Sequence, residues 1–238
     1  MTTQHGTRAA TAQAAVTFDE YRVEKRRGGR AIGLVLYRKR VEPLAPNAPV
    51  LFLVHGSSMS SRTSYDLAVP GADDYSMMDS FARRGFDVWT MDHEGYGRSD
   101  HTDGNSDIAS GVEDLRAAMP LLERETGQAR YHFLGESSGA LRAGAFAMAE
   151  PGRVRRLVLT APTYTGKGSP TLAKRAEQVD YFRTHNRRLR DRAMIESIFT
   201  RDRPGTTDPV VAGAVADMEL VHGDTVPTGT YLDMTANL

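Results

Sequence analysis

The chain has 238 residues and an apolar fraction of 40%, which suffices for the buried core of one sizeable α/β domain. Its 30 basic and 30 acidic residues balance. Net charge therefore gives no reason to expect nucleic acid or an anionic membrane as a partner, and a small, roughly neutral substrate fits better. The absence of cysteine excludes disulfides, thiolate metal sites and a cysteine nucleophile, and it agrees most simply with a cytoplasmic location.

The N-terminal segment Met1–Val16 is polar and alanine-rich and lacks a continuous apolar core. We expect a disordered tail here rather than a secretory signal. Two β-like segments, Thr17–Val23 and Ala31–Arg38, follow on either side of a turn at Gly28-Gly29 and predict a hairpin. No stretch has the apolar length needed to span a bilayer.

Four apolar runs come next, and helical patterns separate them. The runs are Val50–Val54, Phe86–Met91, Tyr131–Leu134 and Val154–Thr160. The helical patterns cover Tyr75–Arg84, Ile108–Glu125 and Ala140–Glu150. This alternation predicts an α/β fold with a doubly wound, mostly parallel sheet, whose functional residues follow the carboxyl ends of the strands.

The alternation ends after Thr163. The remaining segment, Tyr164–Leu238, contains helical patterns at Leu172–Arg190, Ala193–Thr200 and Pro209–Leu220 but no further buried strand. We expect a helical cap that forms a lid over the strand ends. The predicted organisation is a tail (1–16), an α/β core (17–163) and a cap (164–238).

The pentapeptide Gly135-Glu136-Ser137-Ser138-Gly139 lies between the third apolar run and the following helical pattern. In that context it is a candidate nucleophile elbow, in which a strained serine is lifted clear of the sheet. The two glycines are needed because strand and helix backbones pass too close for a Cβ. The spacing selects Ser137, since Ser138 would be flanked by the bulkier Glu136.

Three strand ends together resemble the α/β-hydrolase family. In chain order they are His55-Gly56-Ser57, the loop Asp92–Ser99, and the elbow. The resemblance covers about residues 17–163, and the later segment is similar to the helical cap of that family. It implies that the backbone N–H groups of Ser57 and Ser138 form the oxyanion hole, with Ser58 as the next candidate for the first donor. The loop Asp92–Ser99 is similar to a structural turn of the family and receives no chemical role.

The sequence departs from the family where the general base should be. A serine hydroxyl needs an imidazole to take its proton and a carboxylate to orient that imidazole. The family places both after the cap, on two further strands that we do not find in this chain. His222, next to Asp224, is a weak in-chain candidate for the base, against its interpretation as a solvated cap loop. We therefore expect a C-terminally truncated hydrolase or one piece of a split one.

The function implied by the resemblance is that of a serine hydrolase. It would cleave an ester, amide or related bond of a small apolar substrate through an acyl-enzyme on Ser137, without a cofactor or metal. The alternative is a non-catalytic, hydrolase-like ligand-binding module. An oligomer, or pairing with a C-terminal fragment, is possible in either case.

Two further sets of cap residues remain open in function. Aromatic residues and methionines of the cap could line an acyl pocket, although packing of the cap against the core is the more common role. They are Tyr164, Tyr181, Phe182, Met194, Phe199, Met218 and Tyr231. A basic run at residues 183–192 could meet a carboxylated substrate, although a solvated helix face is the more common interpretation.

Overall fold

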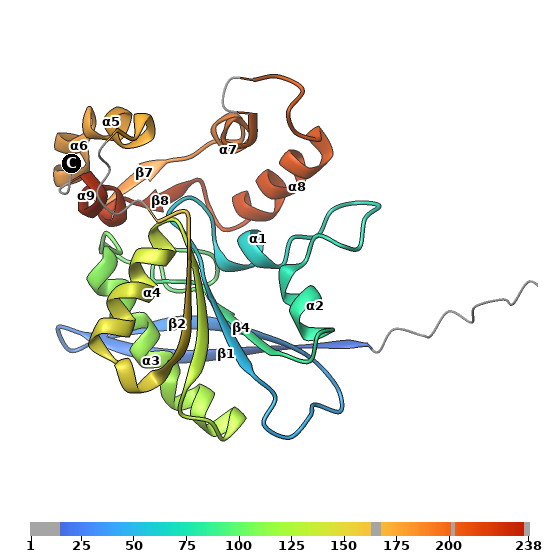
Figure 1. The fold of residues 1–238 in the computed structure, drawn as a ribbon. Coiled ribbons are helices and arrows are strands. Elements are labelled where there is room, and N and C mark those ends of the chain that lie inside the picture. Colours follow the sequence, from blue (N-terminus) through green and yellow to red (C-terminus); the bar gives the residue numbers. More distant parts are fainter. Residues whose placement is uncertain (1–14, 163–167, 201–202, 236–238) are drawn as a thin grey trace, which may run out of the picture.

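The computed structural model describes residues 15–162, 168–200 and 203–235. Most of the predicted tail (1–16) lies outside these residues, as do Thr163 and Tyr164. The described chain forms a central sheet with helices on both faces and a helical cap above one end of the strands (Figure 1).

The central sheet has six strands in the order β1-β2-β4-β3-β5-β6. Its strands are β1 (Val16–Arg27), β2 (Arg30–Val41), β3 (Val50–Val54), β4 (Asp87–Met91), β5 (Tyr131–Glu136) and β6 (Val154–Thr160). The neighbouring strands from β4 to β6 are parallel, β2 pairs antiparallel with β4, and β1 pairs antiparallel with β2. The predicted doubly wound, mostly parallel sheet is confirmed.

Helices cover both faces of this sheet. The core helices are α1 (Ser61–Tyr65), α2 (Met77–Ala82), α3 (Ile108–Thr126) and α4 (Ser138–Ala149), and a short 3-10 helix, η1 (Pro151–Arg153), precedes β6. On one face, residues of α3 and α4 pack with Phe52, Trp89 and Phe133. On the other face, α1 and α2 contribute Tyr65 and Met78 to a second cluster. The two apolar layers fix the orientation of β3 and β5, whose carboxyl ends carry the candidate site.

The hairpin is longer than the sequence predicted, because β1 and β2 pair from Val16 with Val41 to Arg27 with Arg30. Its turn consists of Gly28 and Gly29, both with positive φ, as the glycine pair predicted. The alternating burial of β1 shows that one face of this edge strand points to solvent.

The cap contains the predicted helices and a small sheet that the sequence did not indicate. Its helices are α5 (Pro170–Ala176), α6 (Val179–Thr184), α7 (Arg192–Thr200), α8 (Pro209–Leu220) and α9 (Gly229–Thr235). Two strands, β7 (Arg187–Leu189) and β8 (Thr225–Pro227), pair antiparallel. The expectation that the helical pattern continues to Arg190 is therefore wrong. Among the described helices, none combines the length and the apolar character needed to cross a bilayer.

Strand β6 lies at the edge of the sheet and is more exposed than its apolar sequence predicted. Within the described residues it pairs with β5 alone. Val158 is 49% and Leu159 is 44% exposed, although both are large apolar residues. An open apolar groove of about 1130 Å³ lies beside Leu159, between α3 and α4, and a second of about 510 Å³ lies beside Val158 on the opposite face. An unpaired apolar edge of this kind favours association with another strand.

We predict that the purified chain self-associates through β6. Val158→Lys should raise the monomer fraction severalfold, because a charge on an edge strand opposes strand pairing. Sedimentation velocity at several protein concentrations measures this fraction. Val221→Lys is the matched control, because Val221 is also exposed but lies in the cap. Equal monomer fractions for the two variants would contradict a role for β6.

Candidate active site

Ser137 lies at the corner between β5 and α4 in a strained backbone conformation. Its φ is 56° and its ψ is −122°, a region that L-residues rarely occupy. The N–H of Ser137 donates to the carbonyl oxygen of Thr160 at the end of β6, at 3.0 Å. The side chain is half-buried, and its Oγ makes no hydrogen bond with any described residue. A strained serine with an unbonded hydroxyl at a strand-to-helix corner is the geometry that the pentapeptide predicted.

Both glycines of the pentapeptide are required by close backbone contacts. A Cβ on Gly135 would overlap the carbonyl group of Gly139. A Cβ on Gly139 would overlap the carbonyl oxygens of Val54 and His55 at the end of β3. Helix α4 therefore begins directly against β3, which brings the loop after β3 next to the serine.

A cavity of about 330 Å³ opens at this corner. Ser137, Glu136 and Ser57 contribute to its core side, together with Gly56 and Ser58. The cap side comprises the apolar residues Ile198, Phe199, Val211 and Val215, together with Arg175. The cavity has the size and the mixed lining of a site for a small molecule.

The side chains of the two residues that carry the predicted oxyanion donors are hydrogen-bonded to each other. The hydroxyls of Ser57 and Ser138 are 2.6 Å apart, and both residues are buried. Thr230, from α9, donates its hydroxyl to Ser57 Oγ at 2.9 Å. Among the described residues, neither backbone N–H has a hydrogen-bond partner. Both groups are therefore free to donate to a ligand.

No described histidine is hydrogen-bonded to Ser137. His222 is half-buried in the cap and is not among the residues that line the cavity. His132 lies within β5, as expected, and His55 and His93 are fully buried in the core. Among the described lining residues, Glu136 alone carries a carboxylate, and desolvation by the surrounding protein raises its pKa. The assignments of Ser137 as nucleophile, of the Ser57 and Ser138 N–H groups as donors and of His222 as base stay predictions.

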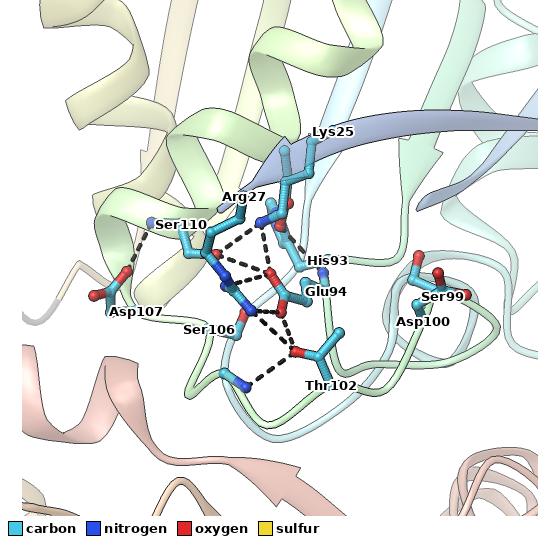
Figure 2. A network of polar contacts seen from close by, with 12 residues as sticks. Lys25, Arg27, His93, Glu94, Ser99, Asp100, Thr102, Ser106, Asp107 and Ser110 are labelled. Carbon is cyan, nitrogen blue, oxygen red and sulfur yellow. Dashed lines mark hydrogen bonds and ion pairs between the residues drawn. The ribbon is translucent and has the colours of Figure 1, made fainter. Parts of the chain in front are cut away.

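A buried polar network holds the loop after β4 to β1 and α3 (Figure 2). Lys25 of β1 makes ion pairs with Glu94 at 2.7 Å and with Asp114 of α3 at 2.6 Å. Arg27 donates to both oxygens of Glu94. Asp114 also accepts from His93 Nδ1 at 2.9 Å. No pattern in the sequence predicts this network, because its members are distant in the chain.

The network continues to the loop after β3 through the two histidines. The backbone N–H of His93 donates to His55 Nε2 at 3.1 Å, and His55 Nδ1 contacts the carbonyl oxygen of Gly56 at 2.8 Å. Burial lowers the pKa of both imidazoles well below the usual value, and nearby positive charge adds to the effect. Both rings are therefore neutral structural groups, and His55 holds Gly56 next to Ser57.

The loop Asp92–Ser99 has the structural role that was predicted, with different partners. Asp92 accepts hydrogen bonds from the backbone N–H and the hydroxyl of Ser61 at 2.9 and 2.6 Å. Burial raises the pKa of this carboxyl against the effect of its hydrogen bonds. Ser99 Oγ accepts from the N–H of Val35 in β2, and Tyr96 donates its hydroxyl to the carbonyl oxygen of Ser57 at 3.0 Å, so the loop is held both to β2 and to the segment after β3.

The basic run of the cap is not a uniformly solvated helix face. Arg190 is buried and pairs with Glu219 of α8 at 2.8 Å. Glu219 in turn accepts from the backbone N–H and the hydroxyl of Ser60, at 2.9 and 2.8 Å. This ion pair connects the cap to the segment that follows the oxyanion loop. Arg183 remains exposed and pairs with Asp180 on its own helix.

The predicted pocket residues of the cap divide between packing and lining. Phe182 and Tyr231 are buried and stack at 5.4 Å between ring centroids. Phe199 lines the cavity of Ser137, and Met194 lines a neighbouring cavity. Tyr181 is exposed. In the part of the chain that the structure describes, no three histidine or acidic side chains are placed to hold a metal ion.

Comparison with known proteins identifies the family. A model of the family described as serine aminopeptidase, S33, matches residues 45–236. The chain belongs to this family of α/β-hydrolases. The match includes β3, the elbow and most of the cap.

Two curated relatives are 2-hydroxy-6-oxononadienedioate/2-hydroxy-6-oxononatrienedioate hydrolases. The protein from Paraburkholderia phymatum is 35% identical over 124 residues, and that from Burkholderia vietnamiensis is 34% identical over 124 residues. Each match covers 51% of this chain and 38% of the relative. The chain therefore matches well under two thirds of the length of these relatives.

Solved structures agree with this family in fold. A bromoperoxidase from Bacillus anthracis superposes with a TM-score of 0.61 at 17% identity, over 92% of this chain and 73% of that one. An enol-lactonase from Burkholderia xenovorans superposes with a TM-score of 0.58 at 21% identity, over 87% and 70% of the two chains. At these identities the likeness concerns the fold alone.

The close contact at the elbow predicts opposite effects for two Gly→Ala variants of α4. Gly139→Ala should lower the free energy of unfolding by about 3 kcal/mol, because the new methyl group meets backbone oxygens that cannot move aside. Gly144→Ala should raise it by about 0.5–1 kcal/mol, because that site is open and alanine favours the helix. Urea unfolding, followed by the fluorescence of the single tryptophan, Trp89, measures both. Similar values for the two variants would contradict the contact.

The buried histidines predict that acid destabilises the fold. His55 and His93 are neutral when folded but bind protons below about pH 6.5 when unfolded. The unfolded chain then binds more protons than the folded chain. The free energy of unfolding therefore decreases as the pH is lowered, by up to about 1.4 kcal/mol per pH unit for each histidine. We expect a loss of about 2–3 kcal/mol between pH 7.5 and 5.5.

Urea unfolding across this pH range measures the loss of free energy of unfolding. His101 and His132 contribute to the loss in the same direction, because burial lowers their pKa as well. The double variant His55→Asn/His93→Asn should show a much shallower slope, whatever its absolute stability. A wild-type free energy that does not change over the range would show that the two imidazoles are not held neutral.

Proposed function

We propose that this chain carries the nucleophile and the oxyanion hole of a serine hydrolase that acts on a small apolar substrate through an acyl-enzyme. The observation that carries the proposal is the conformation of Ser137. Its positive φ and its unbonded Oγ, in a cavity that Ser57 also lines, match what acyl transfer requires. A structural serine would instead satisfy its hydroxyl locally.

In the proposed mechanism, Ser137 Oγ attacks an electrophilic carbonyl carbon, and negative charge develops on the carbonyl oxygen. The N–H groups of Ser57 and Ser138 would donate to that oxygen. Removing one such donor typically costs about 3–4 kcal/mol of transition-state stabilisation. The acyl group would lie against the apolar cap side of the cavity, near Ile198 and Phe199. The tetrahedral intermediate would then break its bond to the leaving group, which departs with a proton and leaves the acyl group on Ser137 Oγ. Water would next attack the acyl carbon, release the acid and restore the serine hydroxyl.

The proton of Ser137 must pass to a base, and no described side chain accepts it. We propose that the base and its carboxylate come from polypeptide outside the described residues. This polypeptide would approach Ser137 at the end of β6, because Thr160 accepts from the N–H of Ser137 and the outer edge of β6 is unpaired in the described structure. His222 is the alternative within the chain.

The bond that is cleaved follows less directly from the site. The curated relatives are named as hydrolases of 2-hydroxy-6-oxononadienedioate, so an oxo acid substrate is compatible with the proposal. An ester, amide or thioester places a carbonyl carbon at the same point. Each of these substrates requires the same nucleophile and donors.

A second candidate function is a ligand-binding module with no turnover. The observation that favours it is the lack of a hydrogen bond between Ser137 Oγ and any described base. The cavity and the donors would then bind a carbonyl or carboxylate ligand. The two functions differ in whether Ser137 becomes acylated.

Reaction with a fluorophosphonate separates these functions. We expect weak or absent labelling of Ser137 in the chain alone, because a serine hydroxyl without a base is a poor nucleophile. Imidazole at high concentration should increase the labelling rate at least severalfold by supplying the base. Intact-protein and peptide mass spectrometry locate the label.

Two variants control this experiment. Ser137→Ala should abolish labelling, and Ser138→Ala should retain it, because the proposal uses only the backbone of Ser138. Robust labelling without imidazole that His222→Ala abolishes would show that the base lies in the cap. No labelling at any imidazole concentration would favour the binding module.

A further inference from the structure

A second cavity of about 470 Å³ adjoins the cavity of Ser137. The two share Ser58, Arg175 and Ile198 among their lining residues. Ser58 directly follows Ser57, one of the predicted oxyanion donors. A substrate could therefore extend from the nucleophile into this second cavity, which we call the basic cavity.

The charges around the basic cavity are all of one sign. Lys174, Arg175 and Arg188 line it, and no described lining residue carries a carboxylate. The rest of its polar lining is uncharged and includes Ser58 and Tyr231. An excess of positive charge in a concave site attracts an anion.

Arg188 and Arg187 differ from the other arginines of the basic run in having no ion pair with a described carboxylate, and of the two only Arg188 lines the basic cavity. Arg183, Arg190 and Arg192 each make an ion pair with a carboxylate of the cap. Arg188 makes none with a described residue. It donates to the hydroxyl of Tyr231 at 2.8 Å, and its buried Nε has no hydrogen-bond partner there.

A guanidinium that is partly buried without a counter-ion is unfavourable unless a ligand compensates it. The side chain is nevertheless held in place. Its Cζ lies 4.6 Å from the centroid of the Tyr231 ring, and Arg175 Cζ lies 4.8 Å from the same centroid. Two like charges are thus gathered at one ring, an arrangement that a bound anion would stabilise.

The pKa of the Tyr231 hydroxyl is affected by the same positive charges. Burial alone raises its pKa, but the nearby charges of Arg188 and Arg175 and the hydrogen bond with Ser58 bring the pKa below the usual value. Ser58 Oγ lies 3.3 Å from this hydroxyl. Arg188, Tyr231 and Ser58 therefore form a connected set of polar groups between the two cavities.

The remaining lining of the basic cavity is apolar and includes Phe182, Met194 and Ile198. A ligand that fits must combine an anionic group with a hydrocarbon chain. The planar fork of a guanidinium matches a carboxylate in particular. Free phosphate carries no apolar part to occupy these walls.

We propose that the basic cavity is a subsite for a carboxylate carried by the substrate, with Arg188 as the principal ligand and Tyr231 and Ser58 beside it. The hydrocarbon chain lies along Met194 and Ile198 and leads to the carbonyl group at Ser137. The inference rests on the proposed function and narrows its substrate to a small acid with an apolar chain. The test uses binding, which needs no turnover.

The experiment measures the binding of hexanoate to the full chain in the Ser137→Ala background by isothermal titration calorimetry. We expect hexanoate to bind at least tenfold more tightly than hexan-1-ol, which has the same chain length and no charge. Added sodium chloride should weaken the binding of hexanoate more than that of the alcohol. Equal affinities for the two compounds would overturn the proposal.

Variants assign the effect to one side chain. Arg188→Gln should weaken hexanoate binding about tenfold and leave hexan-1-ol binding within twofold. Arg183→Gln is the matched control, because Arg183 is exposed and lies outside the lining of the basic cavity, and it should leave both affinities unchanged. Arg188→Lys keeps the charge and should retain part of the affinity for hexanoate. This variant replaces Arg188→Gln as the test if the glutamine variant does not fold. Unchanged hexanoate affinity in a folded Arg188→Gln chain would overturn the assignment.

Inorganic phosphate is the competing anion. We expect it to displace hexanoate at least tenfold less well than octanoate does. Stronger displacement by phosphate would show a phosphate site and overturn the carboxylate assignment. Loss of hexanoate binding in Arg188→Gln would support the subsite even if Ser137 is never labelled, so the subsite and the hydrolase proposal can fail separately.

Discussion

The arrangement of the site depends on one close backbone contact, between the start of α4 and the end of β3. Gly139 touches the carbonyl oxygens of Val54 and His55, so the elbow and the loop after β3 cannot move independently. Two residues beyond His55, Ser57 meets Ser138 at 2.6 Å between hydroxyls. The same contact thus places the nucleophile and both candidate donors. The strain at Ser137 persists because the neighbouring strands and helix over-determine its conformation.

A buried polar network keeps the loops in register with that contact. Lys25 and Arg27 on β1 balance the charges of Glu94 and Asp114, and the two neutral histidines carry the connection to Gly56. Such a network stabilises a unique arrangement only when its members are paired, because an uncompensated buried charge costs about 3–5 kcal/mol. The outermost strand of the hairpin therefore contributes to the active site without touching it.

The sequence predicted the elements whose signals are local. Strand β3 occupies the predicted Val50–Val54, a buried run bounded by Pro49, and α8 occupies the predicted Pro209–Leu220, which begins with a proline after a capping aspartate. The strained corner at Ser137 was also predictable, since the pentapeptide motif is defined within five residues. Pairings between distant segments were not. Strand β7 has only three residues and is a strand because it pairs with β8, thirty-odd residues later in the chain. Likewise, Lys25 pairs with Asp114 only after the sheet has formed.

The same reasoning explains why the base is the element that sequence and structure leave open. A general base contributes about 10²–10⁴-fold to a reaction, whereas donors and binding groups act on an anion with or without it. In the proposed function, the candidate donors and the charged cavity of the described chain would hold a substrate in position before any base is present. Parallel strands end at the same edge of a sheet. A strand added beyond β6 would therefore carry its following loop to the end of β6, where Thr160 bonds the N–H of Ser137. Val158 and Leu159 are exposed at the outer edge of β6, where a further strand would pair. The loop after such a strand would also lie where Ser137 lacks a proton acceptor among the described residues, so one additional strand would account for both observations.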